Sequence, residues 1–157
     1  MTEVWKVVRE INQPPWRAFG LLQSAIVYCT EWGRMYEKGI ATTFPKSAPG
    51  LAFDQYECAK KFMEGRPGLS LQIWKAKAKV LSNPVKSILP YHTMAETLPG
   101  PYQGLQDLED NTIAAFWKSD RWQRGGDKRI HDLQYIPCAP PGTVACLSIT
   151  LLERCDD

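Results

Sequence analysis

The chain has 157 residues, of which 44% are hydrophobic and 23% are charged. This length and balance are typical of one globular domain and exclude a disordered or fibrous chain. The formal net charge of +2 is too small to indicate a nucleic-acid-binding domain by itself. No apolar run reaches the roughly 20 residues of a membrane-spanning helix, and the N-terminus lacks a signal-peptide pattern. We therefore expect a single cytoplasmic domain over residues 1–157, with no membrane partner.

The opening part of the chain predicts two strands. Residues 4–11 mix β-branched and charged side chains in a short alternating pattern, which predicts a strand that ends before Pro14 and Pro15. The β-forming residues at the centre of the run 21–32 predict a second strand at residues 24–30.

A short strand and the main helix follow. Residues 50–53 predict a strand that leads to Asp54, a residue suited to cap the N-terminus of a helix. Apolar side chains recur at three-to-four spacing over residues 54–64, which predicts the helix itself. Gly65 is expected to end it.

Residues 69–81 form the longest predicted strand. Its lysines alternate with apolar residues, so one face carries Lys75, Lys77 and Lys79 and the other carries Trp74, Ala76, Ala78 and Val80. Turn residues close this strand at 82–84, and residues 85–89 predict its hairpin partner. An irregular stretch rich in proline and glycine is expected at 90–104. The pattern at 105–117 leaves helix and strand open, with a strand favoured at 112–117.

The C-terminal part predicts an exposed loop and a closing strand. Residues 119–129 are polar and contain glycines, which is typical of a loop. Residues 143–154 place Ala145, Leu147, Ile149 and Leu151 on one face, which predicts a strand packed on the core. Several strands and one helix indicate an α+β fold. We expect a twisted, mostly antiparallel sheet or partly closed barrel, covered by one main helix at about residues 54–64.

The five cysteines indicate a reducing compartment. Their number is odd, their spacing is wide, and none forms a Cys-x-x-Cys pair, which excludes the usual disulfide frameworks and zinc modules. We predict free thiols at Cys29, Cys58, Cys138, Cys146 and Cys155. A small buried hydrophobic position is favoured over a reactive role, and Cys155, near the end, is the one that could be exposed.

A basic and aromatic set of side chains is the first candidate site. Cationic side chains attract phosphate and aromatic rings stack on bases, so the set predicts an anionic small molecule or nucleic acid as ligand. A solvated strand face and a solvated loop, partly neutralised by Asp120, Asp127 and Asp132, are the alternative. The candidate ligand-binding residues are Lys75, Lys77, Lys79, Arg121, Trp122, Arg124, Lys128 and Arg129.

Two histidines are the candidate catalytic bases. His92 and His131 can titrate near neutral pH, and Glu96 or Asp132 could assist them. Asp132 would point away from its neighbour His131 if this segment is extended, and surface or structural roles are the alternative for both histidines. No metal-ligand spacing and no phosphate-binding, cofactor-binding or hydrolase motif is found, so we expect neither a metal nor a cofactor.

The six tryptophans can build an aromatic pocket or an interface. Trp74 and Trp117 lie in strand-like runs and are predicted to be buried. Trp16, Trp32 and Trp122 lie near turns and are candidates to pack against a partner protein or a second copy of the chain.

A pattern of turn glycines and core positions runs through most of the chain. It consists of Tyr36-x-x-Gly39, Gly50–Phe53 with Ala59 and Phe62, Ile73-Trp74-Lys75, and Pro141-Gly142-Thr143-Val144 with Leu151-Leu152-Glu153. This pattern resembles small uncharacterised proteins of phages, large viruses and microbes. The resemblance implies a shared fold and supplies no catalytic residue.

Three functions are compatible with these patterns. The leading hypothesis is a non-enzymatic binding protein, of the viral accessory or anti-defence type, that sequesters a phosphate-bearing small ligand or contacts nucleic acid. The alternatives are a nucleotide-processing enzyme with a histidine general base and a protein–protein interaction module. No spacing in the sequence selects among the three.

Overall fold

The computed structural model describes residues 1–11, 21–24, 35–46, 49–65, 70–82, 84–86, 121–123, 128–131, 134–136 and 139–155. The described part is mostly strands, with one α-helix, α1 (Tyr56–Glu64), and one 3-10 turn, η2 (Arg121–Gln123). The strands are β1 (Thr2–Ile11), β2 (Leu21–Ser24), β3 (Met35–Tyr36), β4 (Ala41–Thr43), β5 (Gly50–Phe53), β6 (Leu71–Ser82), β7 (Lys128–His131), β8 (Gln134–Ile136) and β9 (Thr143–Arg154). No helix in these ranges is long and apolar enough to cross a membrane.

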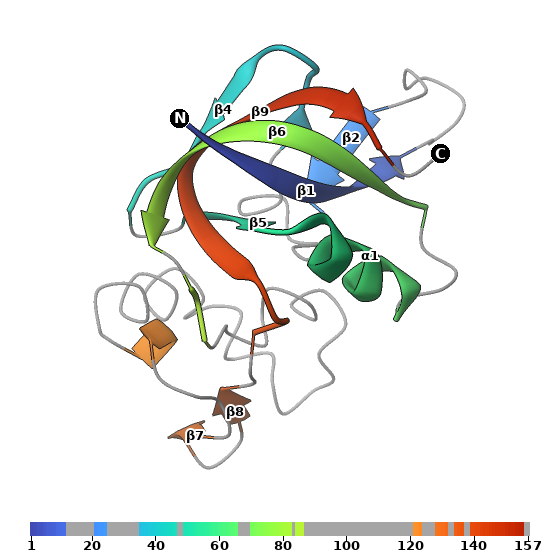
Figure 1. The fold of residues 1–157 in the computed structure, drawn as a ribbon. Helices are drawn as coiled ribbons and strands as arrows, with labels where there is room; N and C mark the ends of the chain where they lie inside the picture. The colour runs from blue at the N-terminus through green and yellow to red at the C-terminus, as the bar shows by residue number, and fades with distance from the viewer. Residues whose placement is uncertain are drawn as a thin grey trace.

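Four strands close into a small barrel-like ring (Figure 1). β6 pairs with β1 and with β9, and β5 pairs with β9 and with β1, each time antiparallel. The strand pairing between β1 and β5 consists of a single residue pair, Trp5 with Phe53. β2 and β3 extend the sheet beyond β1, β4 extends it beyond β9, and β7 and β8 form a separate pair. The expected antiparallel sheet with partial closure is confirmed at this level.

Small and branched apolar side chains fill the ring. Alanines at two inward positions of β6 leave room for larger side chains from the opposite strands, as the narrow interior of a small barrel requires. The buried members of this core are Val4, Val8, Leu22, Tyr36, Phe44, Ala52, Ala76, Ala78, Val144, Cys146, Ile149 and Leu151.

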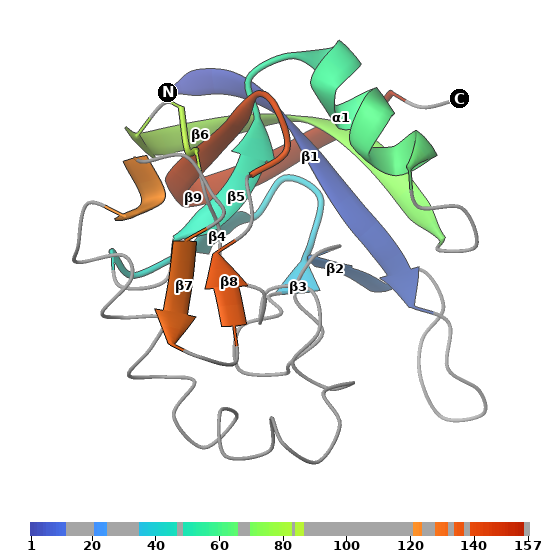
Figure 2. The same ribbon diagram turned by 90° about the horizontal axis from the view of Figure 1, so that it is seen from below.

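The helix α1 covers part of the outer surface of the ring, where it lies against β1 and β6 (Figure 2). Its buried Ala59 and Phe62 pack with Phe53 and Ile73 in a second apolar cluster. The rings of Phe53 and Phe62 lie 5.4 Å apart, centroid to centroid. The helix ends at Gly65, so both the covering helix and its end are confirmed.

The N-terminus of α1 differs from the prediction. The N-cap residue is Gln55, and no side chain caps the helix. The backbone N–H of Asp54 instead donates to the carbonyl of Gly142 at 2.9 Å, so the chain stays extended one residue longer. Gly142 has a φ of 81°, and a Cβ there would lie 2.7 Å from Cys58 Sγ; this turn therefore requires glycine. The prediction of Asp54 as the cap is wrong.

A change of register in β9 decides which of its side chains face the core. The pairing with β6 is irregular at Leu147, which has no partner on that strand. Because one extra residue reverses the alternation of a strand, Val144 and Cys146 before it and Ile149 and Leu151 after it all lie in the core. β9 confirms the predicted closing strand, but the prediction that Leu147 shares the core face with Ile149 is wrong.

Two predictions for the segments after β6 are also corrected. The backbone N–H of Val85 donates to the carbonyl of Thr143, and that of Lys86 donates to the carbonyl of Trp122. Residues 85–86 are therefore bonded to β9 and η2 and not to β6, so the predicted hairpin with β6 is wrong at these two residues. The predicted loop 119–129 contains η2 and the start of β7, and Trp122 is half-buried.

The other predicted strands divide into confirmed and undescribed ones. β1, β5 and β6 confirm the strands expected at 4–11, 50–53 and 69–81. β2 overlaps the strand expected at 24–30 only at Ser24. Residues 25–30, 87–89, 90–104 and 112–117 lie outside the described residues.

Candidate functional site

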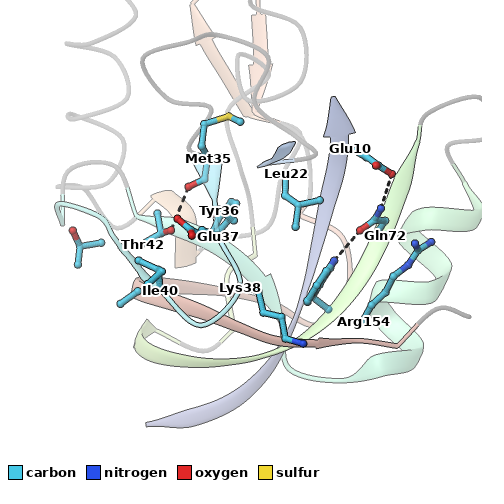
Figure 3. A pocket seen from close by; sticks show the side chains of 13 residues that line it. Glu10, Leu22, Met35, Tyr36, Glu37, Lys38, Ile40, Thr42, Gln72 and Arg154 are labelled. Atoms are coloured by element: carbon cyan, nitrogen blue, oxygen red, sulfur yellow. Dashed lines mark hydrogen bonds between the residues drawn. The ribbon is translucent and has the colours of Figure 1, made fainter. Parts of the chain in front are cut away.

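A hollow of about 980 Å³ lies where the sheet continues beyond the closed ring (Figure 3). Six strands contribute to its lining: β1, β2, β3, β4, β6 and β9. β2 and β3 curl away from one side of the ring and β4 from the other, and the Thr42 hydroxyl donates to the Met35 carbonyl at 3.3 Å between β4 and β3. The volume is within the range of small-molecule sites, roughly 300–1,000 Å³.

A chain of two hydrogen bonds crosses one wall of the hollow. Trp74 Nε1 donates to Gln72 Oε1, and Gln72 Nε2 donates to Glu10 Oε2, both at 2.9 Å. Gln72 is only 6% exposed, while Trp74, which the strand pattern predicts to be buried, is half-buried and lines the hollow. The backbone N–H of Glu10 donates to the carbonyl of Ser70 at 2.9 Å. Hydrogen bonds therefore hold both the backbone and the side-chain carboxylate of Glu10 at this wall.

Charges of both signs surround the hollow. Lys38 and Glu37 lie on the turn between β3 and β4, and Arg154 lies at the end of β9. Figure 3 shows Lys38 on the turn side of the hollow, away from Glu10 and Gln72. The side chains of Glu37, Lys38 and Arg154 are exposed. Figure 3 shows Arg154 on the same side as Gln72 and Glu10, so Lys38 is the cation on the opposite side from the Glu10 acceptor.

A lysine is buried behind this wall. Lys6 is 4% exposed, its Nζ donates to the Leu51 carbonyl at 2.6 Å, and it lies 5.3 Å from the ring centroid of Tyr36. Tyr36 also lines the hollow, whereas Lys6 does not. No ion pair of Lys6 with a carboxylate is found in the described ranges. Within those ranges its ammonium group is held by a carbonyl and a ring.

Burial changes the titration of two neighbouring groups. Burial lowers the pKa of Lys6 from 10.5 to about 8, and the nearby Cys146 opposes this effect. Burial also raises the pKa of the Cys146 thiol from 9.0 to about 12, against the charge of Lys6. Removing a charged group from water disfavours its charged form in both cases. The pKa of each group therefore depends mainly on its burial inside the barrel.

The three lysines of the first candidate set lie on the outer face of β6. Lys77 and Lys79 are exposed, and Lys75 makes an ion pair with Glu3 of β1, with 3.2 Å between Nζ and Oε2. The hydrogen bond and the charge of Glu3 raise the pKa of Lys75. β6 has a paired strand on both sides, so the lysines mark no sheet edge, and acidic side chains stand beside them.

The loop half of that candidate set is described only in part. The half-buried Trp122 has its carbonyl bonded to the Lys86 amide at 2.7 Å, which places η2 close to the segment that follows β6. Arg121, Lys128 and Arg129 belong to η2 and β7, and their side chains are not described. Arg124, Trp16, Trp32 and Trp117 lie outside the described residues.

The candidate catalytic residues fall mostly outside the described part. His131 ends β7, whereas His92, Glu96 and Asp132 lie outside the described residues, so the histidine hypothesis stays a prediction. Within the described ranges, no group of three or more His, Cys, Asp or Glu side chains could hold a metal.

Three of the predicted thiols are described. Cys58, Cys146 and Cys155 are free, and Cys146 is buried. Cys29 and Cys138 lie outside the described residues. Of the three described, Cys146 has the fully buried position expected of a small hydrophobic residue, and Cys58 and Cys155 are half-buried.

Three polar residues, two that line the hollow and one buried beside Tyr36, were not singled out from the sequence. They are Glu10, Gln72 and Lys6, which alternation alone does not separate from a solvated strand face. A signal was present for two of them, because Lys6 lies between the inward positions Val4 and Val8, and Gln72 lies on the apolar face of the longest strand. A polar residue in such a series is informative.

The chain was compared with protein-family models, with curated proteins and with solved structures, and none of them matches. Any functional argument therefore depends on the residues of this chain.

Proposed function

We propose that the protein is a non-enzymatic binding protein that holds a small phosphate-bearing ligand in the hollow between β1, β2, β3, β4, β6 and β9. The observation that carries this proposal is the built wall of the hollow, where Trp74, Gln72 and Glu10 are joined by hydrogen bonds. A buried amide held in one orientation, beside aromatic surface, is typical of a preformed ligand site.

The charge distribution supports a ligand with two different ends. Lys38 supplies a cation for a phosphate on the turn side of the hollow, while Glu10 supplies an acceptor for N–H or O–H donors at the opposite wall. A nucleic-acid polymer would meet the carboxylates of Glu10 and Glu37 in the same hollow, which opposes binding of a long polyanion. A mononucleotide offers a phosphate for the cation at one end and base N–H donors for Glu10 at the other.

The outer lysine face is the competing site. Its side chains stand beside Glu3 and Glu153, so its positive charge is partly neutralised. Lys75, Lys77 and Lys79 do not line the hollow. A viral accessory role is a further part of the proposal, and its support is the resemblance in sequence pattern.

The test compares two exposed lysines. Binding of a panel of nucleoside monophosphates is measured by isothermal titration calorimetry for the wild type, Lys38→Glu and Lys77→Glu. Both variants change the net charge equally, so they share any general electrostatic effect. We expect Lys38→Glu to weaken binding about tenfold, the effect of one charge-assisted contact, and to reduce its salt dependence. Lys77→Glu is expected to bind like the wild type.

Other outcomes would move or remove the site. A loss confined to Lys77→Glu would place the ligand on the outer face of β6. Mass spectrometry of the nucleotide after prolonged incubation gives the second readout, because a binding protein returns its ligand unchanged. Conversion of the nucleotide, lost in His131→Ala, would favour the enzyme hypothesis instead.

A further inference from the structure

We infer that the hollow selects a ring with two adjacent N–H donors, of the guanine type, and that the chain Trp74–Gln72–Glu10 makes this selection. The inference rests on the proposed binding of a nucleotide in the hollow. It adds which base is bound and which residues choose it.

The orientation of the Gln72 amide is fixed from both sides. The indole of Trp74 can only donate a hydrogen bond, so the atom that faces it must be the amide oxygen. The amide nitrogen then faces Glu10, whose carboxylate accepts from it at 2.9 Å. A flipped amide would put a donor against a donor and an oxygen against a carboxylate. The wall therefore presents a carboxylate, held in place, as its acceptor.

The Glu10 carboxylate has capacity left for a ligand. A carboxylate has two oxygens and about four lone-pair sites, and within the described part of the chain Gln72 is the one side chain that donates to it. Glu10 lines the hollow and is half-buried. A group with two parallel N–H donors can therefore bind it in bidentate fashion, which is the strongest arrangement available to a carboxylate.

The indole ring of Trp74 near this acceptor favours a planar ligand group. Trp74 lies against the barrel core and also lines the hollow, so its indole offers a surface on which a base can stack. Guanine presents two adjacent N–H donors on its Watson–Crick edge. Hypoxanthine presents one, and adenine presents a donor beside an acceptor that would face the carboxylate. The predicted order of affinity is therefore guanine, then hypoxanthine, then adenine.

The experiment measures the base preference of three proteins. The dissociation constants of GMP, IMP and AMP are determined by calorimetry for the wild type, Glu10→Gln and Glu37→Gln. Glu10→Gln keeps an oxygen that can accept from Gln72, so the wall is preserved, but it loses the bidentate acceptor. Glu37→Gln is the matched control, because it neutralises another carboxylate of the same hollow. Both variants are checked for folding by circular dichroism.

We expect the wild type and Glu37→Gln to bind GMP at least about tenfold more tightly than AMP, as one bidentate base contact provides. Glu10→Gln is expected to lose this preference while its affinity for AMP changes little or improves. Equal binding of the three nucleotides by the wild type would overturn the base selection and leave the proposed function standing. Absence of binding by all three would overturn both.

Discussion

Replacing Lys6 by methionine should make the protein more stable at neutral pH. Lys6 is 4% exposed and has a pKa of about 8 instead of 10.5. One pKa unit corresponds to about 1.4 kcal/mol, so this shift means that the charged form costs about 3 kcal/mol in the folded state. Methionine fills a similar space without a charge. A buried charge without an ionic partner is commonly less favourable than an apolar side chain of similar size.

The same shift predicts how stability depends on pH. Between about pH 8 and 10.5 the unfolded chain keeps the Lys6 proton while the folded protein releases it, so the free energy of unfolding rises with pH. Cys146 acts in the opposite direction, since the folded protein keeps the thiol proton up to about pH 12 while the unfolded chain loses it near 9.0. The wild type should gain stability from pH 8 to 9, stay level to about 10.5, and then lose it.

Urea denaturation followed by tryptophan fluorescence, at pH 7, 8, 9, 10 and 11, measures both effects. We expect Lys6→Met to gain about 2–3 kcal/mol at pH 7 and to show no rise between pH 8 and 9. Cys146→Ala is the matched control, which should keep the rise and lose the later fall. A Lys6→Met variant that is less stable than the wild type at pH 7, or a wild type without the rise, would refute the reasoning.

Three further changes probe the fold and the hollow. Gly142→Ala should lower the free energy of unfolding by about 3 kcal/mol, because its φ is 81° and the new Cβ would meet Cys58 and Asp54. Gly39→Ala, which has the same φ but open space around it, should lower it by about 1–2 kcal/mol. Equal losses in chemical denaturation would contradict this. Phe62→Ala should cost about 3–5 kcal/mol by opening the cluster under α1, and a smaller loss would mean that α1 contributes little. Trp74→Phe keeps a ring but removes the donor to Gln72, so the ratio of GMP to AMP affinity should fall toward one; an unchanged ratio would show that Glu10 needs no fixed amide.

Local pattern was sufficient for the three long strands, for β5 and for α1, but β3, β4, β7 and β8 were not predicted. Alternation identified β1 and β6, three-to-four spacing identified α1, and Gly65 marked the end of the helix. These signals are local, because the direction of a side chain in a strand or helix depends on its immediate neighbours in sequence. The fold class followed from the order of the elements.

The site needed the tertiary structure. Glu10 and Gln72 are 62 residues apart in sequence, and the pairing of β1 with β6 brings them together. Strand register is set by all the contacts of a sheet at once, so no spacing in the sequence announces that hydrogen bond.

What the sequence by itself determined was the alternation of side chains within each strand, and therefore which residues can share a face. Whether a face points to solvent, to α1 or into the barrel was decided by closure of the ring between Trp5 and Phe53. The irregularity at Leu147 shows the limit most clearly, since one unpaired residue reversed the inward side of β9. Such a reversal lowers the free energy through packing between distant strands, which the alternation of one strand does not encode.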